Sequence, residues 1–290
     1  MNPSSSSGNN NSYPTVVNGF TVTGGHASAA DGKGGGIYIY GDNSKGGIFL
    51  IEQCFLTYNY ASQGGAVYVA EDVKDVNNNI SLISQCVAYN NAAGERSVEE
   101  NAGGGFYIAG EATAANTSAF NNEKGGMRIS PEATVTNCTV ARNTGAGIDL
   151  TEDDHTQNVQ NTIIWGNTTL SLQYQPTFRY SAFHEVEDDD SNNNIYVSDK
   201  NRDKEYGPFF DAPSLSTGFD REYNGENTNY PTWSWDILEG TVMVNKGYSN
   251  FYNQAAYGNE DIKGRPRISG DNIDIGAQEY QFLPTSRRRY

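Results

Sequence analysis

The chain has 290 residues, with 19 basic and 35 acidic side chains and a formal net charge of −16. This charge argues against nucleic acid and anionic lipid surfaces as partners, because both repel an acidic protein. No run approaches the roughly 18 apolar residues of a membrane helix, and the opening MNPSSSSGNNN lacks the basic and apolar regions of a signal peptide.

The first residues precede any recurring pattern. We expect residues 1–13 to be a disordered or truncated segment, so that an export signal lies outside this sequence. The chain then enters its first repeat abruptly at PTVVNGFTVTGG, from Pro14, without a polar covering element. Exposed solenoid ends promote association. We therefore expect that an N-terminal part is missing and that Met1 is the start of a fragment.

One phrase recurs from Pro14 to Leu172. Its copies are IEQCFLTYN from Ile51, ISQCVAYNN from Ile83, VTNCTVARN from Val135 and VQNTIIWGN from Val159. Aligned on the cysteine position, the repeats give Phe20, Cys54, Cys86, Thr117, Cys138 and Thr162, with steps of 34, 32, 31, 21 and 24 residues. Five positions later stand Gly25, Asn59, Asn91, Asn122, Asn143 and Asn167. A second phrase, such as GGAVYV from Gly64, places an apolar-exposed-apolar triplet after turn glycines.

This repetition predicts an all-β, right-handed, single-stranded parallel β-helix over residues 14–172. The triplets alternate with period two, and a 21-residue step is too short for a helical repeat. Longer steps then hold loops, at residues 26–33, 40–47, 71–79 and 93–102. We expect the cysteine column to point inward as three buried free thiols, because an odd count cannot be fully paired. The alternatives are a Cys54–Cys86 disulfide and a nucleophile, although no histidine accompanies the cysteines. The asparagine column should form a hydrogen-bonded ladder.

The C-terminal half is expected to close the coil. We assign residues 173–282 to the final turns and a β-rich or loop cap, and residues 283–290, with Arg287, Arg288 and Arg289, to a tail. Nine aromatic residues of the cap are expected to form its core or, alternatively, to line a sugar pocket. They are Tyr206, Phe209, Phe210, Tyr230, Trp233, Trp235, Tyr248, Phe251 and Tyr252.

Two stretches carry a resemblance to known families. CFLTYNYASQGGAVYV resembles the repeats of chlamydial polymorphic outer-membrane proteins, although Leu56 stands where those repeats usually have Phe. NTIIWGN and the ending DIKGRPRISGDNIDIGAQEY resemble the last turns and cap of secreted choice-of-anchor Q proteins, whereas VMVNKG, from Val242, departs from that pattern. The resemblance implies an extracellular or outer-surface location in a Bacteroidetes-like bacterium, and it implies no single reaction.

The middle position of the second phrase predicts one outward row on a single sheet. The row contains Tyr38, Tyr68 and Tyr107, followed by Arg128 and Asp149. Three exposed tyrosines at about 4.8 Å intervals would make a strip for stacking sugars. The alternative is a tyrosine ladder that only stabilises the strands. Arg128 and Asp149 would form a surface ion pair.

Similarity to β-helix polysaccharide lyases gives the same face a catalytic interpretation. Asp149, Glu152, Asp153 and Asp154 would supply Ca²⁺ ligands, and Arg128 or Lys124 would be the base. A second acidic run, EVEDDD at 185–190, is interpreted as a solvated loop or a further Ca²⁺ site. His26, His155 and His184 have no zinc-ligand spacing, so a zinc site is not expected.

Two functions from different classes follow. The first is a secreted or cell-surface module for glycan binding or adhesion without catalysis, whose partner is a polysaccharide or a host or cell-surface glycan, with other surface proteins as a second class. The alternative is a Ca²⁺-dependent polysaccharide lyase or a glycoside hydrolase, the latter needing two carboxylates across a groove. Ca²⁺ is the one cofactor that the sequence suggests.

Overall fold

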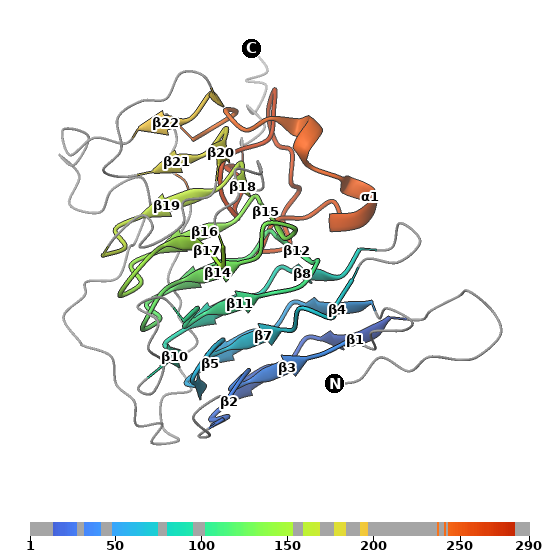
Figure 1. The fold of residues 1–290 in the computed structure, drawn as a ribbon. Coiled ribbons are helices and arrows are strands. Elements are labelled where there is room, and N and C mark those ends of the chain that lie inside the picture. The colour runs from blue at the N-terminus through green and yellow to red at the C-terminus, as the bar shows by residue number, and fades with distance from the viewer. Residues whose placement is uncertain are drawn as a thin grey trace, which may run out of the picture.

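The computed structural model describes residues 14–27, 32–41, 48–74, 80–94, 102–152, 159–168, 177–183, 192–196, 237, 241 and 243–281. Short strands dominate this part of the chain, which also contains a 3-10 turn, η3 (Ser249–Phe251), and the four-residue helix α1 (Gln254–Tyr257). Figure 1 shows the strands stacked into a coil that climbs from the blue N-terminal end to the yellow β20, β21 and β22.

Three parallel sheets form the walls of the coil. Sheet 1 has the order β1 (Thr15–Asn18), β4 (Phe49–Glu52), β8 (Leu82–Ser84), β12 (Thr113–Ala115), β15 (Thr134–Thr136), β18 (Val159–Gln160) and β20 (Phe178–Arg179). Sheet 2 has β2 (Thr21–Thr23), β5 (Phe55–Thr57), β9 (Val87–Tyr89), β13 (Ser118–Phe120), β16 (Thr139–Ala141), β19 (Ile163–Trp165), β21 (Ala182–Phe183) and β22 (Ile195–Tyr196). Sheet 3 has β3 (Ile37–Ile39), β7 (Val67–Val69), β11 (Phe106–Ile108), β14 (Met127–Ile129) and β17 (Ile148–Leu150). The short pair β6 (Tyr60–Ala61) and β10 (Ala92–Ala93) lies between sheets 2 and 3 in chain order.

The register follows the sequence repeats. In sheet 1, Ile51 pairs with Ile83, and Ala114 pairs with both Ile83 and Val135. The chain passes through sheets 1, 2 and 3 in each complete turn and then returns to sheet 1 one layer higher. The predicted parallel β-helix is therefore confirmed, with the repeat phrase marking the same corner in every turn.

The cysteines of the column are buried inside the coil, as predicted. Cys54, Cys86 and Cys138 are free and buried, at 1%, 0% and 0% exposure. Thr117 is also fully buried. Phe20, at the first position of the column, is 61% exposed. It lies on the first described turn, where the next turn, through Phe55, covers it on one side only.

The asparagine ladder is confirmed bond by bond. Asn91 Nδ2 donates to Leu56 O at 2.8 Å and to Asn122 Oδ1 at 3.0 Å, while Asn91 Oδ1 accepts from Asn59 N at 3.1 Å and from Asn59 Nδ2 at 3.0 Å. The same pattern continues through Asn143 to Asn167. Each amide thus satisfies buried backbone groups of the neighbouring turns, which would otherwise cost free energy.

The residue before each cysteine-column position turns the corner between sheets 1 and 2. These residues have positive φ angles of 46–52° and are Gln53, Gln85, Asn116, Asn137, Asn161 and Tyr180. Asparagine tolerates this left-handed conformation better than most residues. Their side chains leave the coil, because the next residue in each repeat is the one that points inward.

The C-terminal segment, residues 243–281, belongs to the range expected to form the final turns and a β-rich or loop cap, and it lies along the side of the coil (Figure 1). Its only β pairing among the described residues is an isolated bridge between Glu260 and Pro266. Met243 and Ile275 pack on the outer face of sheet 2, in an apolar cluster that also contains Tyr89, Phe120, Ile163 and Trp165. This outer face is apolar, so it needs a cover of its own. Six of the nine expected cap aromatics, all between 206 and 235, lie outside the described residues.

Candidate ligand-binding site

The predicted row on sheet 3 is present in the predicted register. Tyr38 pairs with Tyr68, Tyr68 with Tyr107, Tyr107 with Arg128, and Arg128 with Asp149. In each strand the two residues that flank this position are apolar and buried, as in Ile37 and Ile39. The row therefore lies on the outer surface of sheet 3, because alternate residues of a strand face opposite sides.

The exposure of the row differs from the prediction. Tyr38 is 40% exposed, but Tyr68 and Tyr107 are only 2% and 7% exposed, so the expected strip of three accessible rings is wrong. The Tyr68 ring lies 5.6 Å from the Tyr38 ring and 4.9 Å from the Tyr107 ring, measured between centroids. Lys33 Nζ lies 4.7 Å from the centroid of Tyr68. Neighbours on three sides thus cover Tyr68, and the structural ladder is its main role.

The two charged members of the row are also buried. Arg128 is 5% and Asp149 is 1% exposed, so the expected surface ion pair is not at the surface. The Arg128 guanidinium lies 5.6 Å from the Tyr107 ring centroid, which continues the column as a cation–π contact. Lys124, the other proposed base, donates from Nζ to Gly94 O at 2.6 Å. Both proposed bases therefore hold structural contacts, and Arg128 does not face solvent.

The proposed Ca²⁺ ligands are only partly described. Asp149 is buried and Glu152 is exposed, while Asp153 and Asp154 lie outside the described residues. Within the described ranges, no group of three or more His, Cys, Asp or Glu side chains could hold a metal ion. Ca²⁺ takes six to eight oxygen ligands. The described residues do not fit this ion, and we derive no step through it.

The other acidic and histidine candidates add little to this face. The run 185–190, His155 and His184 lie outside the described residues, as do Arg287, Arg288 and Arg289. His26 is exposed, and its ring packs edge-on against Tyr60 with 4.8 Å between centroids.

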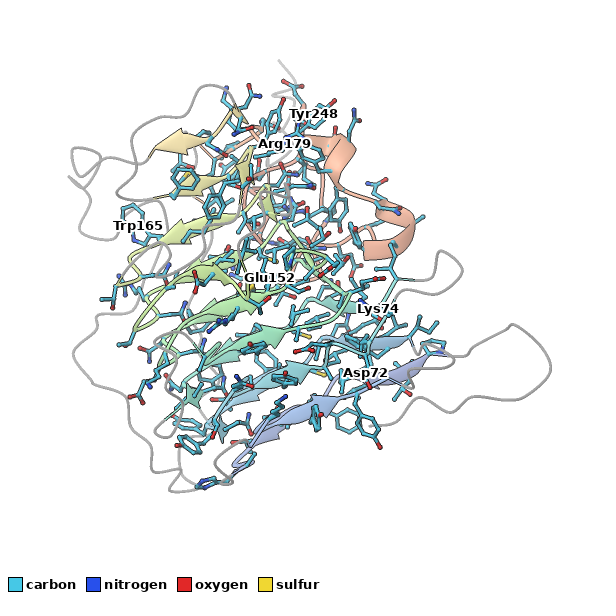
Figure 2. The ribbon with its side chains drawn as sticks, viewed as in Figure 1. Asp72, Lys74, Glu152, Trp165, Arg179 and Tyr248 are labelled. Atoms are coloured by element: carbon cyan, nitrogen blue, oxygen red, sulfur yellow. The ribbon has the colours of Figure 1, made fainter. Side chains whose placement is uncertain are left out.

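An accessible aromatic pair remains at the blue end of sheet 3. Tyr38 and Tyr40 are 40% and 39% exposed, and their ring centroids are 5.8 Å apart. The backbone just after Tyr40 is held by Gly41 N, which donates to Asp72 Oδ1 at 2.9 Å; Figure 2 labels Asp72 at this end of the coil. Tyr40 was missed at the sequence level, although its position two residues after Tyr38 predicts the same outward face. We call Tyr38 and Tyr40 the tyrosine pair.

The tyrosine pair has the chemistry of a carbohydrate contact. A phenol offers a flat apolar face with a polar tip, which suits a wet sugar surface. The rings are supported from behind, because Tyr38 packs on Tyr68 and Tyr68 packs on Tyr107. Such support lowers the conformational entropy that binding would otherwise cost.

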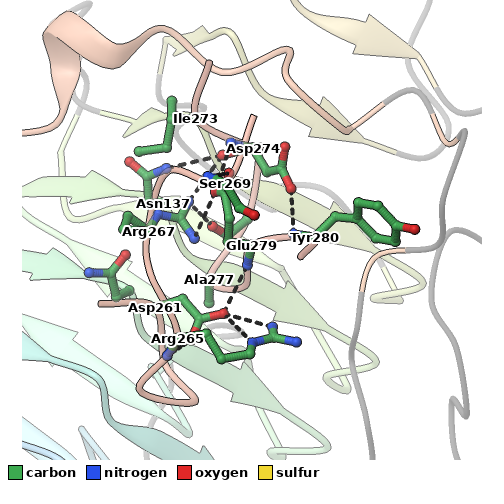
Figure 3. Close-up of polar contacts among 12 residues, drawn as sticks. Asn137, Asp261, Arg265, Arg267, Ser269, Ile273, Asp274, Ala277, Glu279 and Tyr280 are labelled. Atoms are coloured by element: carbon green, nitrogen blue, oxygen red, sulfur yellow. Dashed lines mark hydrogen bonds and ion pairs between the residues drawn. The ribbon is translucent and has the colours of Figure 1, made fainter. Parts of the chain in front are cut away.

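The ending DIGAQE, from Asp274, forms a buried polar cluster on the side of the coil (Figure 3). Glu279 Oε2 accepts from Asp274 N at 3.0 Å and lies 3.9 Å from Arg267 Nη1. Arg267 Nη2 donates to the carbonyl oxygens of Asp274 at 3.0 Å and Gly276 at 2.6 Å. Burial raises the pKa of Glu279 to about 8, against the opposing effect of the Arg267 charge. The motif is therefore a docking element for the C-terminal segment.

Gly276 explains why the motif contains glycine. Its φ angle is +106°, and a Cβ atom there would lie 2.5 Å from Ile163 Cδ1. Gly276 N donates to Asn161 O at 2.8 Å, and Ala277 N donates to Thr139 Oγ1 at 3.0 Å. The backbone of the segment thus approaches the coil more closely than a side chain would allow.

Comparison with known proteins agrees with this geometry. A family model described as the right-handed β-helix region matches residues 7–196. No curated protein and no solved structure matches the chain. Among the described residues, no helix has the length and apolar character to cross a membrane. Because the family model matches well over half of the chain and the parallel sheets stack in the matching region, the chain belongs to the right-handed β-helix family.

Proposed function

We propose that the protein is a secreted or cell-surface β-helix module that binds a glycan through the tyrosine pair, without catalysing a reaction on it. The observation that carries this proposal is the accessible Tyr38 and Tyr40 rings on one outer face, backed by a buried tyrosine stack. The resemblance to choice-of-anchor Q proteins and to polymorphic outer-membrane protein repeats supports the extracellular location. A polysaccharide or a host or cell-surface glycan is the proposed partner.

The same face supports binding better than cleavage. Arg128 is buried against Tyr107, and Lys124 is bonded to a backbone carbonyl, so neither proposed base is presented next to the accessible rings. A general base must come within hydrogen-bond reach of the proton it removes. The lyase alternative therefore has less support than binding.

A glycan-array screen followed by calorimetry tests the proposal. The wild-type protein should retain at least one glycan, and the double variant Tyr38→Ala/Tyr40→Ala should bind it at least tenfold more weakly, because each stacked ring contributes about 1 kcal/mol or more. Phe20→Ala is the matched control, since it removes an exposed ring from another face of the same end. Its affinity should equal that of the wild type.

Two results would contradict the proposal. Unchanged glycan affinity in the folded double variant would remove the tyrosine pair from the site. New unsaturated sugar ends, detected at 235 nm, or new reducing ends released from any polysaccharide would show that the protein is an enzyme.

A further inference from the structure

A second aromatic cluster lies near the yellow end of the coil, where the C-terminal segment crosses sheet 1. It consists of Arg179, Tyr180, Tyr248 and Phe251, all partly exposed, and Figure 2 labels Arg179 and Tyr248 close together in this region. Tyr180 and Tyr248 stack with 4.9 Å between centroids, and Phe251 meets them edge-to-face at 5.8 and 5.0 Å. We call these four residues the arginine–aromatic cluster.

Both the coil and the C-terminal segment fix the positions of the cluster residues in the absence of a ligand. Tyr180 occupies the corner after β20 with a φ angle of 48°. Tyr248 N donates to Asn161 Oδ1 at 2.7 Å, and Asn161 Nδ2 donates to Tyr248 O at 3.0 Å. Phe251 ends η3 and accepts at its carbonyl oxygen from Thr136 Oγ1 at 3.5 Å. Rings fixed in this way lose little conformational entropy when they bind.

Within the described part of the chain, no acidic side chain pairs with Arg179. Among the described residues its guanidinium makes one recorded contact, 4.7 Å from the centroid of Phe251, and no ion pair. By contrast, Arg265 pairs with Asp261 at 2.7 Å.

The neighbours of Arg179 on the preceding turns of its column are uncharged. Its partner on the adjacent turn is Gln160, which is followed on successive turns by Thr136, Ala115 and Ser84. The first carboxylate of this column is Glu52, five turns and roughly 24 Å away. Arg179 is thus a partly exposed cation with no acidic neighbour among the described residues, so its charge can pair with an anionic ligand.

We propose that the arginine–aromatic cluster binds a sugar ring that carries a carboxylate. A planar guanidinium matches a carboxylate with two parallel hydrogen bonds, and the adjoining rings offer apolar surface to the ring of the same sugar. The rest of the protein repels anions, so recognition depends on this short-range pairing. The site is independent of the tyrosine pair, which lies at the opposite end of the coil on sheet 3 (Figure 1).

Saturation-transfer NMR and calorimetry with three matched sugars test the proposal on the wild-type protein. Glucuronate should bind, whereas its neutral methyl ester and glucose should bind at least tenfold more weakly, because they keep the ring and lose the charge. Equal binding of the methyl ester would overturn the proposal. Equal binding of glucose 6-sulfate would overturn the assignment to a carboxylate, since the site would then recognise charge alone.

Variants then locate the site. Arg179→Gln should lower glucuronate affinity at least tenfold, and Arg179→Lys should give an intermediate loss, because lysine keeps the charge without the planar fork. Arg142→Gln, which removes the same charge from another, half-buried corner, is the control and should leave affinity unchanged. Full binding by folded Arg179→Gln and Arg179→Lys proteins would overturn the proposal.

The proposals for the two sites can be tested independently. Tyr38→Ala/Tyr40→Ala should retain glucuronate binding if the arginine–aromatic cluster is the site, and it should lose the array glycan if the tyrosine pair is its site. Loss of glucuronate binding in the tyrosine double variant would assign that ligand to the tyrosine pair and overturn the inference.

Discussion

Tyr68 and Tyr40 are both outward-facing tyrosines of sheet 3 or its edge, yet their environments differ completely. Tyr68 has a tyrosine on the turn below and another on the turn above, and Lys33 lies over its ring. Tyr40 is 39% exposed and contacts Tyr38. The same residue type therefore serves packing in one case and remains available for a ligand in the other.

This contrast predicts different costs for two tyrosine deletions. Tyr68→Ala should lower the free energy of unfolding by about 3 kcal/mol or more, because a large buried ring leaves a cavity. Tyr40→Ala should lower it by about 0.5 kcal/mol, as for most exposed sites. Chemical denaturation of both variants checks this, and equal costs would show that the burial of Tyr68 does not contribute to stability.

At the level of single residues, the repeat predicted which side of a strand each side chain faces, but it did not predict how exposed the outward side chains are. The inward cysteines and the asparagine ladder follow from local rules, since alternation and the turn geometry act within one repeat. The burial of Tyr107 and Arg128 depends on how closely the side chains of neighbouring turns pack, which the repeat pattern does not specify. The exposure of Phe20 was also not predictable from the repeat. Phe20 lies on the first described turn, so a described turn covers it on one side only.

The C-terminal segment makes contacts with the coil that the sequence did not predict. Four corner side chains donate to its backbone or side chains: Gln85 to Asp261 O at 2.8 Å, Asn116 to Tyr252 Oη at 2.6 Å, Asn137 to Asp274 O at 3.2 Å, and Asn161 to Tyr248 O at 3.0 Å. The recurring polar residue before the cysteine column was the signal for this contact. It could not be interpreted from sequence, because corner residues with positive φ are polar for conformational reasons alone.

The apolar side of the segment gives a matched pair of variants. Ile275→Asp places a charge at 0% exposure in the outer apolar cluster and should lower the free energy of unfolding by several kcal/mol. Ile268→Asp, at 40% exposure in the same segment, should cost less than 1 kcal/mol. Thermal denaturation and binding of an apolar dye compare the two, and similar behaviour would mean that the segment does not cover sheet 2.

Glu279 predicts a pH dependence of this element. Its pKa is about 8 in the fold, against 4.5 for an ordinary glutamate, because burial disfavours the charged form. Between these values the folded state binds more protons than the unfolded state, so stability falls as pH rises from about 4.5 to about 8. The slope contributed by Glu279 approaches about 1.4 kcal/mol per pH unit.

Glu279→Gln should remove that slope. Urea denaturation at several pH values measures it in both proteins, and the difference between their slopes isolates Glu279 from other groups, including Asp274, whose pKa burial also raises. Parallel profiles for the two proteins would refute the assignment.

For the whole molecule, the stack has unequal ends. Val16 and Phe20 on the first described turn are 52% and 61% exposed, whereas the turns through Ile83 and Val135 are buried on both sides and are also bound to the C-terminal segment. Stability in such arrays is a sum of turn and interface terms. Opening should therefore begin at β1, β2 and β3.

Amide hydrogen exchange followed by mass spectrometry checks this order. Peptides that contain β1–β3 should exchange first, and those from β12 to β16 should exchange last, at rates close to global unfolding. Exchange that is uniform along the coil would contradict the end-first expectation. The coil could be predicted because the same sequence pattern recurs in successive turns. The path of residues 243–281 could not, because it depends on contacts that occur only once.

The hydrogen bonds between the corner side chains and the C-terminal segment constrain the number of turns that the segment can span. It meets the turn of Asn161, descends to the turn of Gln85 and returns to Asn161 by way of Asn137. A turn inserted between Gln85 and Asn161 would shift one anchor by about 4.8 Å and break the match. Turns added before Gln85 would disturb none of these bonds. The coil can therefore vary in length before Gln85 without loss of these bonds, whereas the number of turns between Gln85 and Asn161 is constrained.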